Sequence, residues 1–74
     1  MKITYDPTVD VLRILFQETP IAESDEDASG IIFDYDVNGN VVGLEVLAAS
    51  KRVDDPQSMS YTILTSKSNW SDAV

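Results

Sequence analysis

The segment 31–47 constrains the fold of this chain more than any other. Two β-rich runs flank Asn38-Gly39, the dipeptide most favoured in two-residue hairpin turns. Such a turn would place Val37 opposite Asn40. Each further pair lies one residue earlier on the first strand and one residue later on the second. Because side chains alternate along a strand, this register predicts one shared apolar face. Its members are Ile31, Phe33, Tyr35, Val42, Leu44 and Val46.

Alternating apolar residues predict further strands outside this hairpin. Lys2–Tyr5 and Val11–Phe16 form a predicted first hairpin, and Met59–Thr65 a predicted final strand. Ala48–Val53 contains helix formers but has room for only a turn or two. The predicted fold is therefore α+β but mostly β: a small antiparallel meander of about five or six strands, with one short helix after the central hairpin.

The chain has the length of one small domain, predicted over residues 1–66, followed by a loose C-terminal tail over residues 67–74. The segment 17–29 breaks the apolar pattern, and within it Glu23–Asp27 is a dense acidic run. Runs of like charge are usually solvated, so we expect a loop there.

The composition narrows the function classes. The chain has no Cys and no His, and its net charge is −8. Disulfides and the usual nucleophilic triads are therefore excluded, and we expect no enzyme, no cofactor and no metal centre. The negative charge disfavours nucleic acid and favours a basic protein partner. The sequence has no apolar run of membrane-spanning length, so we expect a soluble cytoplasmic protein without membrane contacts.

One motif points to a different chemistry. Asp34, Asp36, Asn38-Gly39 and Glu45 match the spacing of a calcium-binding EF-hand loop. That loop requires a helix on each side, whereas β-rich runs flank this one. In the hairpin register Asp34 and Glu45 lie diagonally on one flat face and cannot encircle an ion together with Asn38. The hairpin is the favoured interpretation, and weak divalent binding stays open as an alternative.

Several motifs are similar to those of a known family. They are Tyr5-Asp6-Pro7, Val11-Leu12-Arg13-Ile14, Asp34-Tyr35-Asp36 followed by Gly39, and Gly43-x-Glu45-x-Leu47-x-Ala49-Ser50-Lys51-Arg52. Over residues 2–53 the chain resembles the small prokaryotic family called domain of unknown function 2283. The resemblance implies a compact β-rich fold that ends in a short helix, and no assigned activity. Some small acidic families of this kind are encoded beside small toxins, which suggests an antitoxin-like role.

Two functional hypotheses follow. The first is a non-catalytic interaction module that forms homo-oligomers, binds a basic protein, or does both. The second is a domain that binds a ligand or divalent ion on the acidic face of the central hairpin. The candidate partner-binding residues are Asp34, Asp36, Glu45, Ser50 and Arg52.

Overall fold

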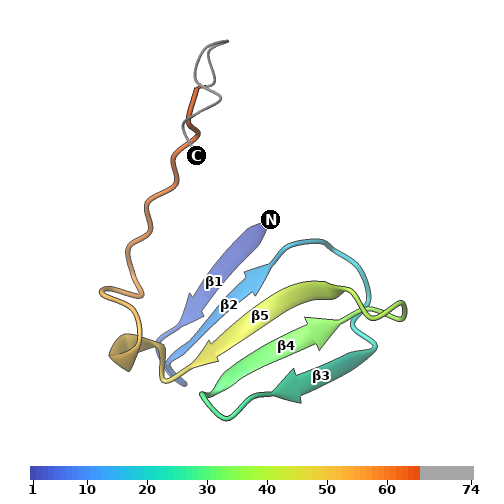
Figure 1. Ribbon diagram of the computed structural model, residues 1–74. Coiled ribbons are helices and arrows are strands. Elements are labelled where there is room, and N and C mark those ends of the chain that lie inside the picture. The colour runs from blue at the N-terminus through green and yellow to red at the C-terminus, as the bar shows by residue number, and fades with distance from the viewer. Residues whose placement is uncertain (66–74) are drawn as a thin grey trace.

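The computed structural model describes residues 1–65 and shows one antiparallel sheet (Figure 1). Its strands are β1 (Lys2–Asp6), β2 (Val11–Leu15), β3 (Glu23–Glu26), β4 (Ile31–Tyr35) and β5 (Val41–Leu47). A single 3-10 turn, η1 (Ala49–Lys51), follows β5. The mostly β, antiparallel prediction is confirmed, with five strands and no longer helix in the described part of the chain.

The strand order is β1-β2-β5-β4-β3, so the sheet is not a simple meander. The strand β2 pairs with β5, and the connection from β2 to β3 passes the ends of β5 and β4. This connection is tied to the sheet by its backbone. Phe16 N donates to Val42 O at 2.8 Å, and Ala22 N donates to Tyr35 O at 2.8 Å. The consecutive strands β3, β4 and β5 are neighbours in the sheet, and the preceding strand β2 lies beside β5. This is a Greek-key arrangement.

The central hairpin is confirmed, but its turn differs from the two-residue turn predicted at Asn38-Gly39. Asp36 N donates to Asn40 O at 2.9 Å, which leaves a loop of three residues between them. Gly39 is the one loop residue with a positive φ, at 84°. This is the three-residue hairpin loop in which a type I turn is followed by a left-handed residue. A two-residue type I′ turn would need positive φ at Asn38 as well.

A β-bulge in β5 corrects the register that this turn sets. The turn pairs Tyr35 with Val41, one residue away from the predicted partner Val42. Beyond the bulge Asp34 pairs with Gly43 and Phe33 with Leu44, as the sequence predicts. The extra loop residue and the extra strand residue thus compensate each other, so the apolar face survives.

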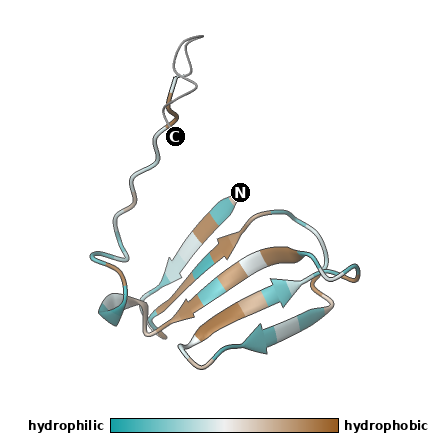
Figure 2. Cartoon of the chain, viewed as in Figure 1, coloured by the Kyte–Doolittle hydropathy of each residue, from teal (hydrophilic) through white to brown (hydrophobic). Residues whose placement is uncertain are grey.

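The acidic run Glu23–Asp27 is not the predicted loop. Its first four residues form β3, an edge strand that pairs with β4, and all four are exposed. In Figure 2 this strand has the hydrophilic colour, whereas brown bands cross β2, β5 and β4. An edge strand needs little burial, because hydrogen bonds to one neighbour hold it, and its charges discourage further pairing.

The predicted helix over Ala48–Val53 is reduced to η1. Ala48 is left-handed, with φ 53° and ψ 47°, so helical backbone cannot begin there. Ala49 is completely buried, and its N–H donates to Asp10 O at 3.0 Å. The turn is therefore positioned by a contact with the β1–β2 connection rather than by helix propensity.

The predicted final strand Met59–Thr65 is not formed. This segment is extended and exposed, and it leaves the sheet without pairing with it (Figure 1). The predicted tail at 67–74 lies outside the described residues. Among residues 1–65 no helix is long and apolar enough to cross a membrane.

Candidate interaction surface

One face of the sheet, here called the apolar face, carries large apolar side chains from four strands. By register its members are Ile3, Tyr5, Leu12, Ile14, Ile31, Phe33, Leu44 and Val46. None of them is fully buried, and Ile3 is 37% exposed. Within residues 1–65 the only fully buried apolar side chains are Val42 and Ala49. A sheet of one layer leaves this face without a second layer of secondary structure to cover it.

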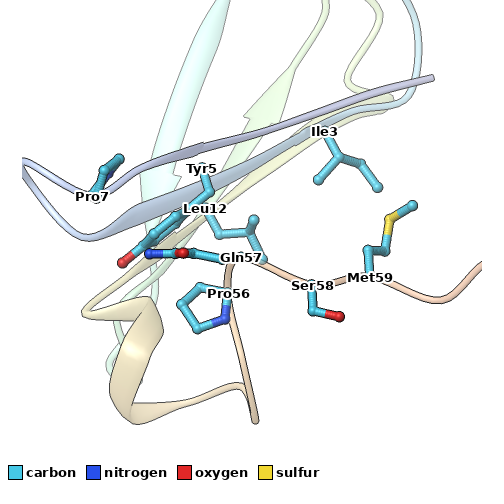
Figure 3. Close-up of a pocket in the computed structure, with 8 residues that line it drawn as sticks. All are labelled: Ile3, Tyr5, Pro7, Leu12, Pro56, Gln57, Ser58 and Met59. Carbon is cyan, nitrogen blue, oxygen red and sulfur yellow. The ribbon is translucent and has the colours of Figure 1, made fainter.

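The C-terminal segment after η1 covers only part of this face. It passes below β1 and β2 and leaves an open cleft of about 500 Å³ (Figure 3). Ile3, Tyr5 and Leu12 line one side of the cleft, and Pro56 and Met59 line the other. Tyr5 is its one titratable lining residue, so the cleft offers apolar contact rather than acid–base chemistry.

Beyond the cleft the segment exposes large apolar side chains. Tyr61 is 68% exposed, Ile63 76% and Leu64 72%, and Met59 at the border of the cleft is 60% exposed. No charged residue lies between Ser58 and Thr65. The open part of the apolar face and this uncharged segment are thus two exposed apolar regions of the kind that marks protein–protein contacts.

The opposite face contains the candidate residues Asp34 and Glu45. Asp34 is completely buried, and its Oδ1 accepts a hydrogen bond from Ser24 Oγ at 2.7 Å. Its Oδ2 is buried and has no hydrogen-bond partner among the described residues. Burial raises the pKa of Glu45, and hydrogen bonding to Asp34 and its negative charge raise it further, against the smaller effect of Arg13. A protonated Glu45 can therefore donate to the Asp34 carboxylate.

Asp36 has a structural role in the hairpin loop. Its Oδ1 accepts hydrogen bonds from the N–H groups of Asn38 and Asn40, both at 2.9 Å. These bonds, with Asn40 first, lower the pKa of the Asp36 carboxyl. A carboxylate that caps its own turn in this way stabilises the loop.

Ser50 is also occupied by contacts within the fold. Ser50 Oγ donates to Asp10 Oδ2 at 2.7 Å, and Ser50 N donates to Asp10 Oδ1 at 2.9 Å. Tyr5 Oη donates to the same Oδ1 at 2.7 Å. The bonds from Ser50 and then Tyr5 lower the pKa of Asp10, while the pKa of Tyr5 is raised chiefly by its bond to Asp10. This cluster of Tyr5, Asp10 and Ser50 fastens η1 to the first hairpin.

Arg52, the last candidate, is exposed and lies beside the β3–β4 turn. A Cβ atom added at Gly30 would lie 3.4 Å from Arg52 Nη2. Gly30 has a φ of 91°, a conformation that L side chains rarely adopt. The Arg52 guanidinium thus lies close to the backbone of Gly30, at a position where a residue with a side chain would be strained.

The structure does not gather the five candidates into one site. Asp34 and Glu45 are neighbours, whereas Asp36, Ser50 and Arg52 belong to separate turns. Among residues 1–65 no group of three or more acidic side chains is arranged to hold a metal ion. The EF-hand spacing therefore has no geometric counterpart here, because Asp34 is buried in a strand and Asp36 caps a turn. Sequence reasoning missed the role of Asp10, although Tyr5 and Ser50 lie in the motifs that carry the family resemblance.

Comparison with known proteins identifies the family. The family model described as "Protein of unknown function (DUF2283)" matches residues 2–50. The chain belongs to this family, and the matched segment contains all five strands and most of η1. Comparisons with curated proteins and with solved structures found no match.

Proposed function

We propose that this protein is a non-catalytic interaction module that associates with a second copy of itself and presents an acidic exterior to a basic protein. The observation that carries the proposal is the apolar face, which one layer of sheet and one crossing segment leave partly open. Burial of apolar surface is the main favourable term in folding and association. Without disulfides, a chain of this size gains much of its stability by association.

Concentration-dependent unfolding tests the self-association. A dimer gains stability by mass action, so its melting temperature should rise as the protein concentration increases from low micromolar to submillimolar. An unchanged melting temperature over this range would remove self-association from the proposal.

The acidic exterior supports the second part of the proposal. The strand β3 presents Glu23, Asp25 and Glu26, all exposed, and Asp27 follows them. A basic partner would be drawn to this edge at low salt, and its attraction would weaken as salt is added. Capture of a basic protein at such an edge is also how an antitoxin-like role would operate.

A lysine-rich peptide is a suitable probe of this edge. The double variant Asp25→Asn/Glu26→Gln should bind it more weakly than the wild type in a titration at low salt. The matched control Glu18→Gln/Asp54→Asn removes two exposed acids elsewhere and should retain more of the binding. Equal losses in both double variants would show that net charge alone, and not β3, attracts the peptide.

A further inference from the structure

The sheet has two edges, and they differ in how well they can accept another strand. The edge strand β3 has the sequence Glu-Ser-Asp-Glu. Two such strands placed antiparallel would bring Glu23 of one copy opposite Glu26 of the other. Like charges directly opposite each other oppose pairing, so β3 is protected against it.

The other edge, β1, lacks this protection. It has the sequence Lys-Ile-Thr-Tyr-Asp and pairs with β2 alone. Among the described residues no backbone group of β1 makes a hydrogen bond to backbone outside that pairing. The outward-facing N–H and C=O groups of β1 are therefore available to a further strand.

The sequence of β1 is self-complementary. When two copies run antiparallel with Thr4 opposite Thr4, Lys2 of each copy lies opposite Asp6 of the other. Ile3 of each copy then lies opposite Tyr5 of the other. Directly opposite residues lie on the same face of a sheet, so the ion pairs share one face and the apolar pairs share the other.

We infer that two copies of this chain associate through their β1 edges, antiparallel about a two-fold axis at Thr4. This inference rests on the proposed self-association and specifies where the contact lies. The two five-stranded sheets become one continuous sheet. Such an isologous contact closes on itself and leaves both acidic β3 edges at the outside.

The joined sheet also extends the apolar face across the axis. Ile3 and Tyr5 of both copies lie next to the axis and continue the face formed by Leu12 and Ile14. Met59 and Tyr61 line a hollow with Met1 and Ile3, so the uncharged C-terminal segment begins beside the axis. From there its exposed apolar side chains can pack on the joined face.

Charge reversal with rescue tests the register. Lys2→Asp places two acidic side chains opposite each other across the axis, and Asp6→Lys places two lysine side chains opposite each other. Each single variant should therefore weaken the dimer about tenfold in sedimentation velocity. The double variant Lys2→Asp/Asp6→Lys restores opposite charges and should recover most of the wild-type affinity.

Two controls accompany the charge reversals. Lys51→Asp, at an exposed position in η1 and outside the β1 strand, changes the net charge as Lys2→Asp does and should have a smaller effect. Circular dichroism verifies that the variants fold, because Asp6 Oδ1 accepts a bond from Thr8 N that Asp6→Lys removes.

A cysteine at the axis gives a second, independent readout. The chain has no cysteine, and directly opposite residues in an antiparallel pair lie about 4.5–5.5 Å apart at Cα, within reach of a disulfide. Thr4→Cys should cross-link into a covalent dimer under mild oxidation, and Asp25→Cys on the β3 edge should not. If the wild type dimerises but neither charge reversal nor Thr4→Cys behaves as expected, the β1 contact is wrong and self-association stands. A wild-type protein that stays monomeric at all concentrations tested overturns both the β1 contact and the proposed self-association.

Discussion

Asp34 and Gly43 lie directly opposite each other at the centre of the sheet, and the missing side chain of Gly43 makes room for the buried carboxylate. A Cβ atom at position 43 would lie 3.4 Å from Asp34 Oδ2 and 3.1 Å from Ile14 O. The second atom belongs to the backbone of β2, which pairs with β5 here and cannot yield easily.

Gly43→Ala should therefore destabilise the fold, by about 1–3 kcal/mol, as overpacking of a tight site usually does. Urea unfolding monitored by circular dichroism measures the change. The exposed residue Val37, replaced by Ala, provides the control and should change little. An unchanged unfolding midpoint for Gly43→Ala would contradict this account, because it would show that β2 and β5 can move apart here at little cost in stability.

The pair of Asp34 and Glu45 should make stability depend on pH. Because the folded-state pKa of Glu45 is raised above 4.5, the folded state holds a proton that the unfolded chain releases. Stability from this group is present at low pH and is lost as pH rises from about 4.5 through the raised pKa. Glu45→Gln keeps a donor for Asp34 at every pH and should flatten this fall. Glu26→Gln removes an equal charge from β3 and should leave the fall in place; equal profiles for both variants would contradict the pairing.

The contacts of Asp10 should have the opposite pH dependence. Its pKa is lowered from 3.8 by Ser50 and Tyr5, so its contribution is present above that value and is lost as pH falls below it. Ser50→Ala and Tyr5→Phe should each lower the melting temperature at neutral pH. Because both donors bond to one carboxylate, the double variant should lose a different amount from the sum of the two. Strict additivity would mean that Asp10 does not couple them.

The β-bulge gives a matched pair of neighbouring valines. Val42 is completely buried, whereas Val41 is 39% exposed. Val42→Ala should cost roughly 1.5–3 kcal/mol, and Val41→Ala clearly less. Guanidinium unfolding of the two variants measures the difference. Similar costs would contradict the assignment of Val42 as the interior residue of the bulge.

The strand pairing of the central hairpin was predictable because several apolar residues on both strands indicate the same register. Ile31 with Val46 and Phe33 with Leu44 pair as expected, since a slip by one residue would place Asp34 and Asp36 on the apolar face. The turn was not predictable to the residue. Asn-Gly favours the two-residue loop, but the Asp36 carboxylate binds the N–H groups of Asn38 and Asn40 and stabilises a longer one. The bulge at Val42 then restores the pairing.

Two of the wrong element assignments have a common physical cause. Local composition predicts a loop at Glu23–Asp27 and a strand at Met59–Thr65, whereas strand pairing decides both. The acidic residues of β3 form a strand since β4 offers them an open edge. The alternating segment Met59–Thr65 has high β-propensity but pairs with no strand of the described chain, although the β1 edge is open. Propensity describes what fits a pleated surface, and only a neighbouring strand supplies that surface.

The candidate site was only partly predictable for a related reason. Polar residues such as Asp36 and Ser50 make hydrogen bonds within their own chain. Asp36 accepts from backbone N–H groups, and Ser50 Oγ donates to Asp10, which is forty residues away in the sequence. Without the fold, a polar residue that binds a partner cannot be distinguished from one that binds its own chain. The adjacency of Asp34 and Glu45 did follow from the register, although the complete burial of Asp34 did not.

Sedimentation equilibrium of the wild-type protein tests the central claim most directly. The chain has a mass of 8.2 kDa, and the proposed self-association predicts an apparent mass that rises toward twice this value with concentration and then stops rising. A closed two-fold contact explains such a limit. An apparent mass that stays at 8.2 kDa up to submillimolar concentration would contradict the account.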